Sequence, residues 1–530
     1  MSRPADDQTF WDDIEAYCGK LSYATDETVS LHVSTRSTAF DVTIQRWGAQ
    51  RVTVWERADL VGTFHDVPAD ADQNGCGWPV TMEIPVLHWE SGFYLVTLKA
   101  QGAATGRDIA HAGFVVRPPR GQHRAGRALL VLATNTWNSY NTWGGRSLYT
   151  GGKEVSFSRP FGRGMLCRPE VDRDDRKARP RRWGEDHDVE GMEFQRYRTA
   201  KNYPAAIGST GWFTYERRFT EWAEAAGYEL DFAVSSDLET PGILDDHDLV
   251  LSVGHDEYWS LDMRDTVEHF VAEGGTWASF SGNTMFWQVR LEETGTAVIK
   301  DKMVCHKYSA HTTDPVVGSE RAHQMSGLWS DPLIGRPEWE FLGASSAWGL
   351  YHRFGQATAR AAGGFTVYRH RHWLFDSTGL GYGDMLGADF GVVGYETVGA
   401  RLTFDEYQQP VPAPHHMALE HPTIYPDRTE IVAFAPASNL GVGEYPKSIS
   451  ALSDQGDAEF IADRLYGKID EDSLRRIRQG NAVMLVTQPS ESAGEVIIIG
   501  STDWCFGLPH DPAVAQVTAN VINRGLRASG

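Results

Sequence analysis

The feature that most constrains this fold is a change of hydrophobic period near residue 120. Residues 20–118 contain short runs in which apolar and polar residues alternate, such as VSLHVST at 29–35 and GFYLVTLKA at 92–100. Clusters of Gly, Pro and Asp separate these runs, and none has helical spacing. Strands of this length with turn signals between them predict a β-sandwich, of immunoglobulin-like type, as a first domain over residues 1–122.

Beyond a basic linker at 117–127, strands and helices alternate. ALLVLAT at 128–134 is typical of a strand that is buried on both faces, and YERRFTEWAEAAG at 215–227 has the apolar spacing of a helix. Further strands and helices follow through residue 282, and the pattern returns after residue 428. This alternation predicts a doubly wound parallel α/β sheet, which we expect to be amidotransferase-like.

The same pattern predicts the domain boundaries. The α/β domain covers residues 123–300, is interrupted by a β-rich insertion at 301–428 with Gly-rich segments, and is completed by residues 429–530. More than one domain is expected in any case, because a chain of 530 residues exceeds the size of about 250–300 residues at which single cores stop growing.

Charge and cysteine content exclude several classes of function. The formal net charge of −22 argues against nucleic acid and against an anionic membrane surface as partners. The five cysteines include no CxxC pair, and their odd number argues against a disulfide framework or a zinc ribbon. The N-terminal residues have no apolar h-region and no long apolar run follows, so we expect a cytoplasmic protein without membrane segments.

Polar and aromatic side chains follow four of the expected sheet strands, at the points where those strands end. The segments are NTWNSYNTWGGRSLYTGG at 135–152, HDEYWS at 255–260, NTMFWQ at 283–288 and TDWCFG at 502–507. The carboxyl ends of parallel strands meet at one edge of a sheet, and ligands bind there in open α/β folds. We therefore expect the four segments to form one site.

The first of these segments is too polar and glycine-rich for a core helix or a buried strand, so we interpret it as a loop that lines a pocket. Gly144 and Gly145 allow close backbone approach, and Tyr140 and Tyr149 supply phenols. The alternative is that each tyrosine only packs in a core with its hydroxyl bonded, which is the commoner fate of a tyrosine. Exposed Trp and Gly-rich loops on an acidic chain also favour a symmetric homo-oligomer.

The second segment places His255 and Glu257 at the same edge of the sheet. The alternative is helix capping, with Ser260 as the N-cap and the acidic residues near the positive end of the following helix. We assign Asp256 to that capping role and keep His255 and Glu257 as candidates for the site.

Standard nucleophile and metal motifs are absent from the sequence, which has no G-x-S-x-G elbow, no HExxH and no P-loop. Cys505 lies between Trp504 and Phe506, so we expect it to pack in a core rather than to act as a nucleophile. His415 and His416 are adjacent and point in different directions on a strand, so metal binding is not expected there.

Taken together, these segments resemble a known family. NTWNSYNTWGGRSLY, GYELDFAVSSDLE, VLSVGHDEYWSLDMRD, SGNTMFWQVR and GSTDWCFGL are similar to the large-subunit family of N,N-dimethylformamidase, and the resemblance covers most of residues 125–515. A preceding sandwich is also usual in that family. Its characterised enzyme hydrolyses an amide with a mononuclear iron held by two tyrosines and one glutamate. The resemblance implies a metal-dependent amide hydrolase that cleaves a small amide to a carboxylic acid and an amine.

The resemblance also implies metal ligands at three positions. The first tyrosine matches Tyr140, the second matches Tyr149, and the glutamate matches Glu257. Tyr215 is a rival for the second tyrosine, because Tyr140 and Tyr149 lie close together in the sequence. Ferric iron is the implied cofactor, since a phenol with a pKa near ~10 binds as phenolate only to a strong Lewis acid, whereas zinc more often takes His or Cys.

Three further residues match positions that support catalysis in the family. Glu396 in VGYETVG would accept a proton and pass it to the leaving amine, and Asn283 would steady the attacking water or the developing oxyanion. His255 would support these groups without binding the metal. The implied partners are a small-molecule amide and, besides the homo-oligomer, a small partner subunit.

Two other classes of function are compatible with the same residues. One is a different metal-dependent hydrolase, or an iron–phenolate redox enzyme, on the same scaffold. The other is a non-catalytic protein that binds a carbohydrate or a metabolite at a Trp-rich edge.

Overall fold

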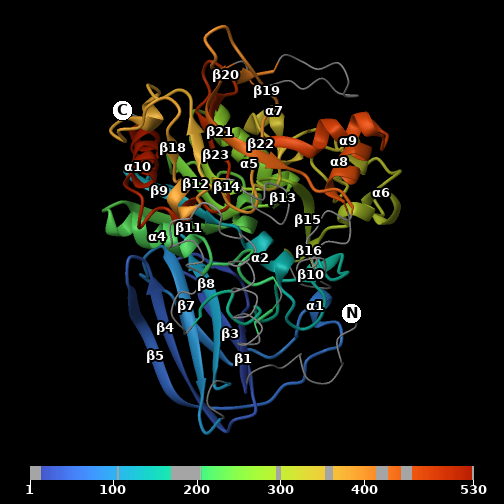
Figure 1. Ribbon diagram of the computed structural model, residues 1–530. Coiled ribbons are helices and arrows are strands. Elements are labelled where there is room, and N and C mark those ends of the chain that lie inside the picture. The colour runs from blue at the N-terminus through green and yellow to red at the C-terminus, as the bar shows by residue number, and fades with distance from the viewer. Residues whose placement is uncertain are drawn as a thin grey trace.

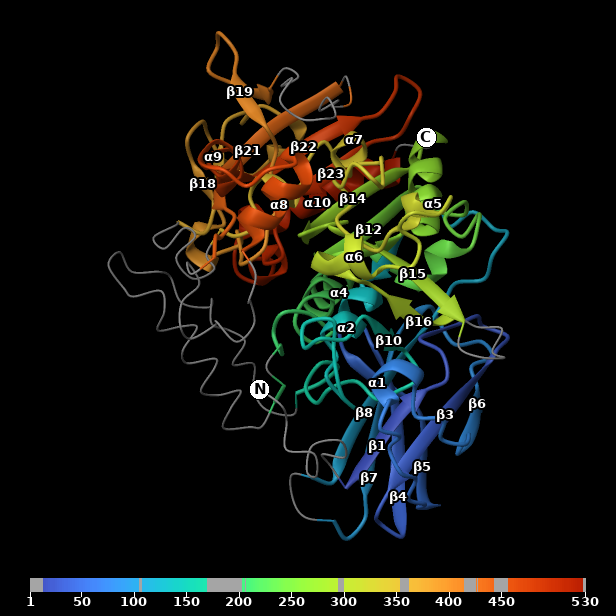
Figure 2. The same ribbon diagram turned by 90° about the vertical axis from the view of Figure 1, so that its right-hand side faces the viewer.

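The computed structural model describes residues 13–103, 107–168, 203–204, 206–293, 300–352, 362–413, 426, 428–442 and 456–527. Two parts are stacked end to end, with the N-terminal strands below and a larger sheet with its helices above (Figure 1), and the side view shows the same arrangement (Figure 2). His415 and His416 lie outside the described residues.

The N-terminal part consists of two sheets around one apolar core. The first sheet has the order β1 (Ile14–Cys18), β3 (Thr28–Thr35), β6 (Met82–Pro85), and the second has the order β2 (Ser22–Tyr23), β8 (Ile109–Val116), β7 (Gly92–Ala100), β4 (Ala39–Trp47), β5 (Arg51–Val61). Leu31 of the first sheet and Val96 and Phe114 of the second lie in the same buried cluster, because alternate side chains of each strand point inward. The strand-rich N-terminal part is confirmed, while its immunoglobulin-like type stays a prediction.

The C-terminal part is built on one nine-stranded sheet. Its order is β11 (Glu229–Val234), β9 (Arg127–Leu132), β12 (Leu249–His255), β14 (Thr276–Gly282), β23 (Val496–Ile499), β22 (Gln479–Gln488), β21 (Arg428–Ser438), β17 (Phe365–Val367), β18 (Met385–Leu386). The strands from β11 to β23 are parallel, and the remaining four run antiparallel to their neighbours.

The expected parallel sheet is therefore right for one half and wrong for the other. Only residues 489–495 separate β22 from β23, and a parallel crossover needs a dozen or more residues, so the chain turns back as a hairpin. The amidotransferase-like type of the sheet stays a prediction.

Helices cover both faces of the parallel half. Leu129 of β9 lies in one core with α5 (Leu261–Ala272), and the next residue, Leu130, lies in the opposite core with α4 (Glu216–Ala225) and α10 (Pro512–Arg527). A strand between two helical layers is apolar at successive positions, which explains the uninterrupted apolar run of β9.

The expected N-cap of α5 is confirmed. The Ser260 hydroxyl accepts a hydrogen bond from the Met263 N–H at 3.3 Å. The other α-helices of the described residues are α1 (Ala71–Asn74), α2 (Thr134–Tyr140), α6 (Ala310–Thr313), α7 (Trp339–Leu342), α8 (Asp457–Tyr466) and α9 (Glu471–Arg478). Across the described ranges, no helix combines the length and the apolar character that crossing a bilayer requires.

The strands of the expected insertion at 301–428 are divided among three sheets. β17 and β18 extend the main sheet, and β19 (Leu402–Phe404) pairs with β20 (Pro410–Pro412). A further four-stranded sheet has the order β10 (Glu154–Ser156), β16 (Lys300–Val304), β15 (Trp287–Glu293), β13 (Tyr258–Ser260). The predicted domain boundaries stay predictions.

Candidate functional site

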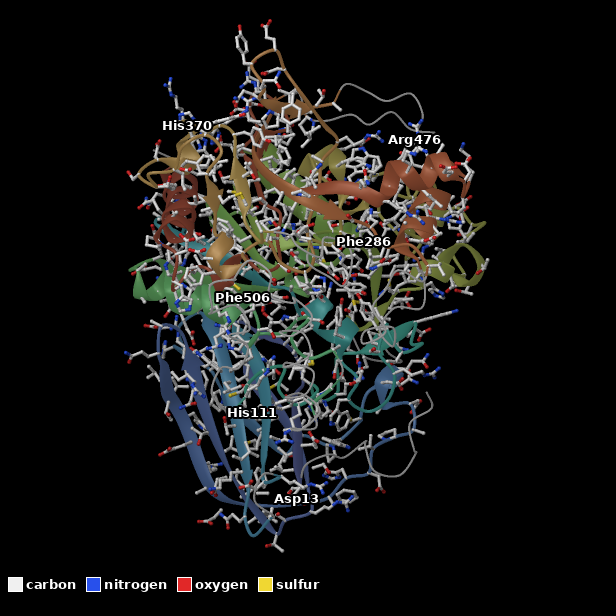
Figure 3. All side chains as sticks on the ribbon, viewed as in Figure 1. Asp13, His111, Phe286, His370, Arg476 and Phe506 are labelled. Atoms are coloured by element: carbon white, nitrogen blue, oxygen red, sulfur yellow. The ribbon has the colours of Figure 1, made fainter. Side chains whose placement is uncertain are left out.

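The candidate site lies at the carboxyl edge of the parallel strands. The chain passes from β9 to β11 on one side and then to β12 on the other, so the strand order reverses at β9, which is where open α/β sheets bind ligands. Phe286 and Phe506, which follow the ends of β14 and β23, both lie in the upper part of the molecule, whereas His111 lies in the sandwich below (Figure 3).

The segment after β9 begins with a buried helix, so our expectation of a loop is wrong for residues 135–140. Tertiary partners bond several of the polar side chains of α2. Asn135 Nδ2 donates to the Tyr258 carbonyl oxygen at 3.2 Å, and Trp137 Nε1 donates to Glu216 Oε1 at 2.8 Å. A polar helix is stable in a core once its groups are bonded, and the sequence of one segment does not reveal partners that lie elsewhere in the chain.

The tryptophans of this segment are also buried. Trp137 belongs to the main core, and Trp143 packs against Trp78 of the N-terminal part with ring centroids 5.9 Å apart. They do not form the exposed aromatic surface from which we expected a homo-oligomer, so assembly stays a prediction without that support.

Tyr140, Tyr149 and Glu257 converge on one point. Tyr149 Oη donates to Glu257 Oε2 at 2.8 Å and lies 2.9 Å from Oε1, and Tyr140 Oη donates to Oε2 at 3.3 Å. The two phenol rings are adjacent, with centroids 4.1 Å apart. The structure thus brings together the three residues that the resemblance proposed as metal ligands.

The carboxylate of Glu257 is held rigidly. Trp287 Nε1 donates to its Oε1 at 2.7 Å, and the Glu257 N–H donates to Thr136 Oγ1 of α2 at 3.0 Å. Glu257 lies between β12 and β13, so the strand end and the buried helix together fix its position.

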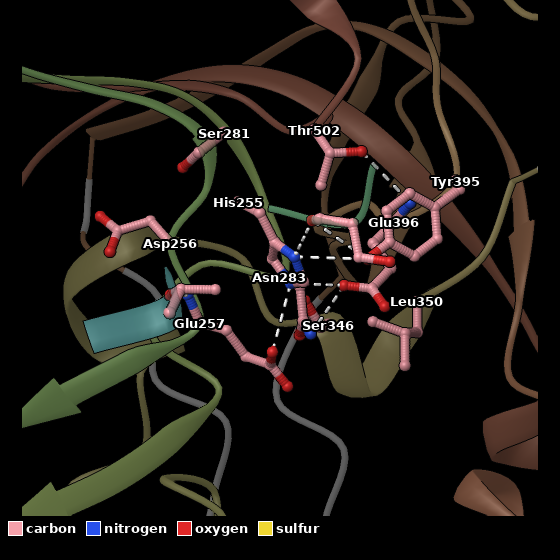
Figure 4. A network of polar contacts seen from close by, with 12 residues as sticks. His255, Asp256, Glu257, Ser281, Asn283, Ser346, Leu350, Tyr395, Glu396 and Thr502 are labelled. Atoms are coloured by element: carbon pink, nitrogen blue, oxygen red, sulfur yellow. Dashed lines mark hydrogen bonds and ion pairs between the residues drawn. The ribbon is translucent and has the colours of Figure 1, made fainter. Parts of the chain in front are cut away.

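His255 joins Glu257 to a second carboxylate (Figure 4). His255 Nε2 lies 2.6 Å from Glu396 Oε2 and 3.3 Å from Glu257 Oε2. Its other ring nitrogen, Nδ1, lies 2.9 Å from the Ser209 carbonyl oxygen and 3.3 Å from Tyr395 Oη. Because both ring nitrogens face oxygen acceptors, the arrangement favours the doubly protonated imidazolium.

Asn283 completes this side of the site. Its Nδ2 donates to Glu396 Oε2 at 3.0 Å, while its Oδ1 has no hydrogen-bond partner among the described residues. The backbone of Asn283 is left-handed, with φ of 50°, and a Cβ on the preceding Gly282 would lie 2.2 Å from the Glu396 carbonyl oxygen. A strained residue with an unsatisfied buried acceptor is typical of a functional position.

The surroundings determine the charge of each group. Burial and the Glu257 carboxylate raise the pKa of Tyr140 and Tyr149 well above the usual value, so both phenols keep their protons unless a cation displaces them. Burial lowers the pKa of His255, but Glu396 and Glu257 outweigh it and raise that pKa well above its usual value. Burial raises the pKa of Glu257, but His255 outweighs it and holds that pKa below its usual value.

The donor set fits a hard, highly charged cation. The phenol and carboxylate oxygens lie 2.8–3.3 Å apart, and two neighbouring ligands of an octahedral ion with bonds of ~2.0–2.1 Å are ~2.9 Å apart. His255, Glu257 and Glu396 also offer ligand atoms that all lie within 4.8 Å of one another.

The remaining candidates from the sequence have other surroundings. Tyr215, the rival ligand, is buried in the main core and packs edge-on against Phe506, with centroids 5.9 Å apart. Cys505 is buried in the same core as expected, and all five cysteines are free. Asp256 accepts a hydrogen bond from Ser252 Oγ at 2.6 Å, which differs from the capping role that we assigned to it.

Sequence reasoning missed four residues that contact the site. They are Tyr258, Trp287, Lys307 and Tyr395. Tyr258, Trp287 and Tyr395 lie within the motifs that contain Glu257, Asn283 and Glu396. Each carries an O–H or N–H group, which could have suggested a role at the site. Lys307 lies outside every motif and could be found only from the structure.

The chain is similar to known proteins at two levels, a solved structure and a family profile. Among solved structures, the crystal structure of the two tandem V-type regions of VCBP3, a v-region-containing chitin binding protein, matches 23% of this chain and 59% of its own at 8% identity and a TM-score of 0.14. The chain thus spans less than two thirds of that structure, and the likeness is too weak to support an argument. No curated protein matches the sequence. The sequence profile described as N,N-dimethylformamidase beta subunit-like, C-terminal, matches residues 41–517, and the chain therefore belongs to the N,N-dimethylformamidase beta subunit-like family.

Proposed function

We propose that this protein is a metal-dependent amide hydrolase that cleaves a small amide to a carboxylic acid and an amine. The observation that carries the proposal is the convergence of two phenols on Glu257, directly beside a second carboxylate held by His255 and Asn283. Family membership supports the reaction class. Two carboxylates, two phenols and an imidazole in one buried place are difficult to explain by packing alone.

We propose one ferric ion as the cofactor, held by Tyr140, Tyr149 and Glu257. An all-oxygen donor set with two phenols suits a hard trivalent ion better than zinc, which more often takes His or Cys. When bound, the ion supplies Lewis acidity toward the amide carbonyl and toward water.

The neighbouring residues then move the proton. Glu396 accepts a proton from the attacking water and transfers it to the amine nitrogen as the C–N bond breaks. His255 holds the carboxylate of Glu396 through its 2.6 Å contact, and Asn283 holds the same oxygen at 3.0 Å. The unpartnered Oδ1 of Asn283 is an acceptor that orients the water.

Elemental analysis coupled to an activity assay tests this function. Protein purified without added metal is expected to contain close to one iron per chain and to show a visible band from phenolate-to-iron charge transfer. Amine release is measured from formamides and from larger amides. Iron without amine release favours a redox enzyme on the same scaffold, and a metal-free wild-type protein favours a binding protein.

The assembly and location of the protein belong to the same proposal. We propose a cytoplasmic homo-oligomer that acts with a small partner subunit. Light scattering across a concentration series tests the oligomer, and recovery of activity on adding fractions of the native host tests the subunit.

A further inference from the structure

Lys307 is a buried cation beside the site, and the proposed reaction does not use it. It follows β16 in the short 3₁₀ turn Lys307–Ser309, and its side chain is buried. Its Nζ donates to Tyr258 Oη at 2.8 Å, and no carboxylate of the described residues forms an ion pair with it. A buried ammonium group without a counter-ion is costly, so its surroundings must compensate.

Aromatic rings provide part of this compensation. Lys307 Nζ lies 3.4 Å from the ring centroid of Tyr149, 5.2 Å from that of Trp287 and 5.4 Å from that of Tyr258. A cation over a ring face is attracted by the ring quadrupole, most strongly at short range. The nearest ring belongs to Tyr149, one of the proposed metal ligands.

A hydrogen-bond chain leads from Lys307 to the same tyrosine. Lys307 Nζ donates to Tyr258 Oη, Tyr258 Oη donates to Tyr149 Oη at 2.9 Å, and Tyr149 Oη donates to Glu257. Every donor points toward Glu257, and such chains polarise and strengthen their members. A negative oxygen on Tyr149 would therefore have a donor already directed at it.

The backbone holds Lys307 in an unusual conformation. Its φ is 50°, in the left-handed region that residues with a side chain rarely adopt. The N–H groups of His306 and Lys307 both donate to the Ser326 carbonyl oxygen, at 3.1 and 3.0 Å. These bonds fix the turn, and strain that is enforced in this way is common where side-chain direction matters.

We propose that Lys307 and Tyr258 form a positioning pair that holds Tyr149 in place as a metal ligand and offsets its negative charge. This inference rests on the proposed metal-dependent function. The ammonium group is the missing counter-charge of the ligand oxygen, and Tyr258 transmits its effect by a directed hydrogen bond. Neither residue takes part in proton transfer at Glu396.

The experiment compares the iron-loaded wild-type protein with Lys307→Met and Tyr258→Phe. Each variant removes positive charge or hydrogen-bond donation near the Tyr149 oxygen, which raises the energy of its electrons. We expect the phenolate-to-iron band to move to longer wavelength in both variants. We also expect the iron to be lost to a chelator roughly ten-fold faster or more, because a hydrogen bond to a charged group is removed.

Two matched substitutions serve as controls. Lys300→Met removes a lysine from the same region that pairs with Glu239 at the surface, and Tyr308→Phe removes a neighbouring hydroxyl that donates to Asp457. Both should keep the wild-type band and iron retention. Tyr258→Phe preserves the shape of the buried ring, so it tests the inference even if Lys307→Met does not fold.

The outcomes separate this inference from the proposed function. A wild-type band that neither iron-loaded variant shifts would overturn the positioning pair while leaving the metal site intact. A wild-type protein that binds iron without a phenolate band, or that binds no metal, would overturn the tyrosine ligands and the pair together.

Discussion

Buried carboxylates lie at both edges of the parallel strands, in opposite surroundings. At the amino-terminal edge, Asp231 of β11 is completely buried and is held by Arg124, Arg127 and His247 with N···O distances of 2.8–3.1 Å. Burial raises the pKa of Asp231, but its hydrogen bond with His247 and the two arginines outweigh burial and hold that pKa well below the usual value. Its negative charge is fully compensated.

At the carboxyl edge, the buried carboxylates have fewer positive partners. Among the described residues, ion pairs give Glu257 and Glu396 a single shared positive partner, His255. The other donors to Glu257 are phenols and an indole. Carboxylates that share one ion-pair partner gain more from an added cation than a carboxylate that already has three. The comparison separates an ion cluster that holds strands together from one that we propose to be a metal site.

The largest expected effect is at the carboxyl edge. Glu257→Ala removes the carboxylate on which both phenols converge, so we expect the purified variant to lose its bound iron and its turnover. Elemental analysis and amine release measure the two losses. If the variant retains the iron content of the wild-type protein, the proposed ligand set is wrong.

The next effect separates metal binding from proton transfer. Glu396→Gln keeps the shape of the side chain and the contact with Asn283 but removes the basic oxygen, so iron content should stay at the wild-type level. We expect kcat to fall by about 10²–10⁴-fold, the usual contribution of a general acid–base group. Turnover close to that of the wild type would exclude Glu396 as the base.

The amino-terminal cluster should respond in stability only. Asp231→Asn leaves two arginines without their buried partner, and we expect a loss of about 3–5 kcal/mol in the free energy of unfolding. Iron content and turnover of the folded fraction should be unchanged. Urea denaturation measures the loss, and an equal loss of iron would contradict the separation of the two edges.

The pH dependence of that stability follows from the lowered pKa of Asp231. The contribution of Asp231 is fully present above the unfolded pKa near ~4 and is lost as the pH falls toward the lower folded pKa. The stability of the wild-type protein should therefore fall more steeply below pH ~4 than that of Asp231→Asn.

The smallest effect concerns the rival tyrosine. Tyr215→Phe removes a hydroxyl in the main core, so we expect unchanged iron content and a stability loss of about 1 kcal/mol. Tyr149→Phe, the matched change at the site, should lose iron and the phenolate band. The reverse result would exchange the roles of the two residues.

Sequence patterns predicted strands and helices correctly where one hydrophobic period runs through the whole element. The apolar run of β9 and the helical spacing of α4 each reflect burial against a neighbouring layer, and such burial leaves a local record in the sequence. The prediction failed for α2, since its polar side chains are bonded by residues such as Glu216 that lie far away in the chain.

The sequence by itself determined the family, through motifs that follow strand ends, and with it the residue types offered for chemistry. Tertiary structure alone decided which of them meet. Tyr140 and Glu257 are 117 residues apart and Asn283 and Glu396 are 113 apart, and spacing along a chain does not fix a distance in space. Only the fold places Lys307 over Tyr149, because that contact depends on a strained turn and not on any motif.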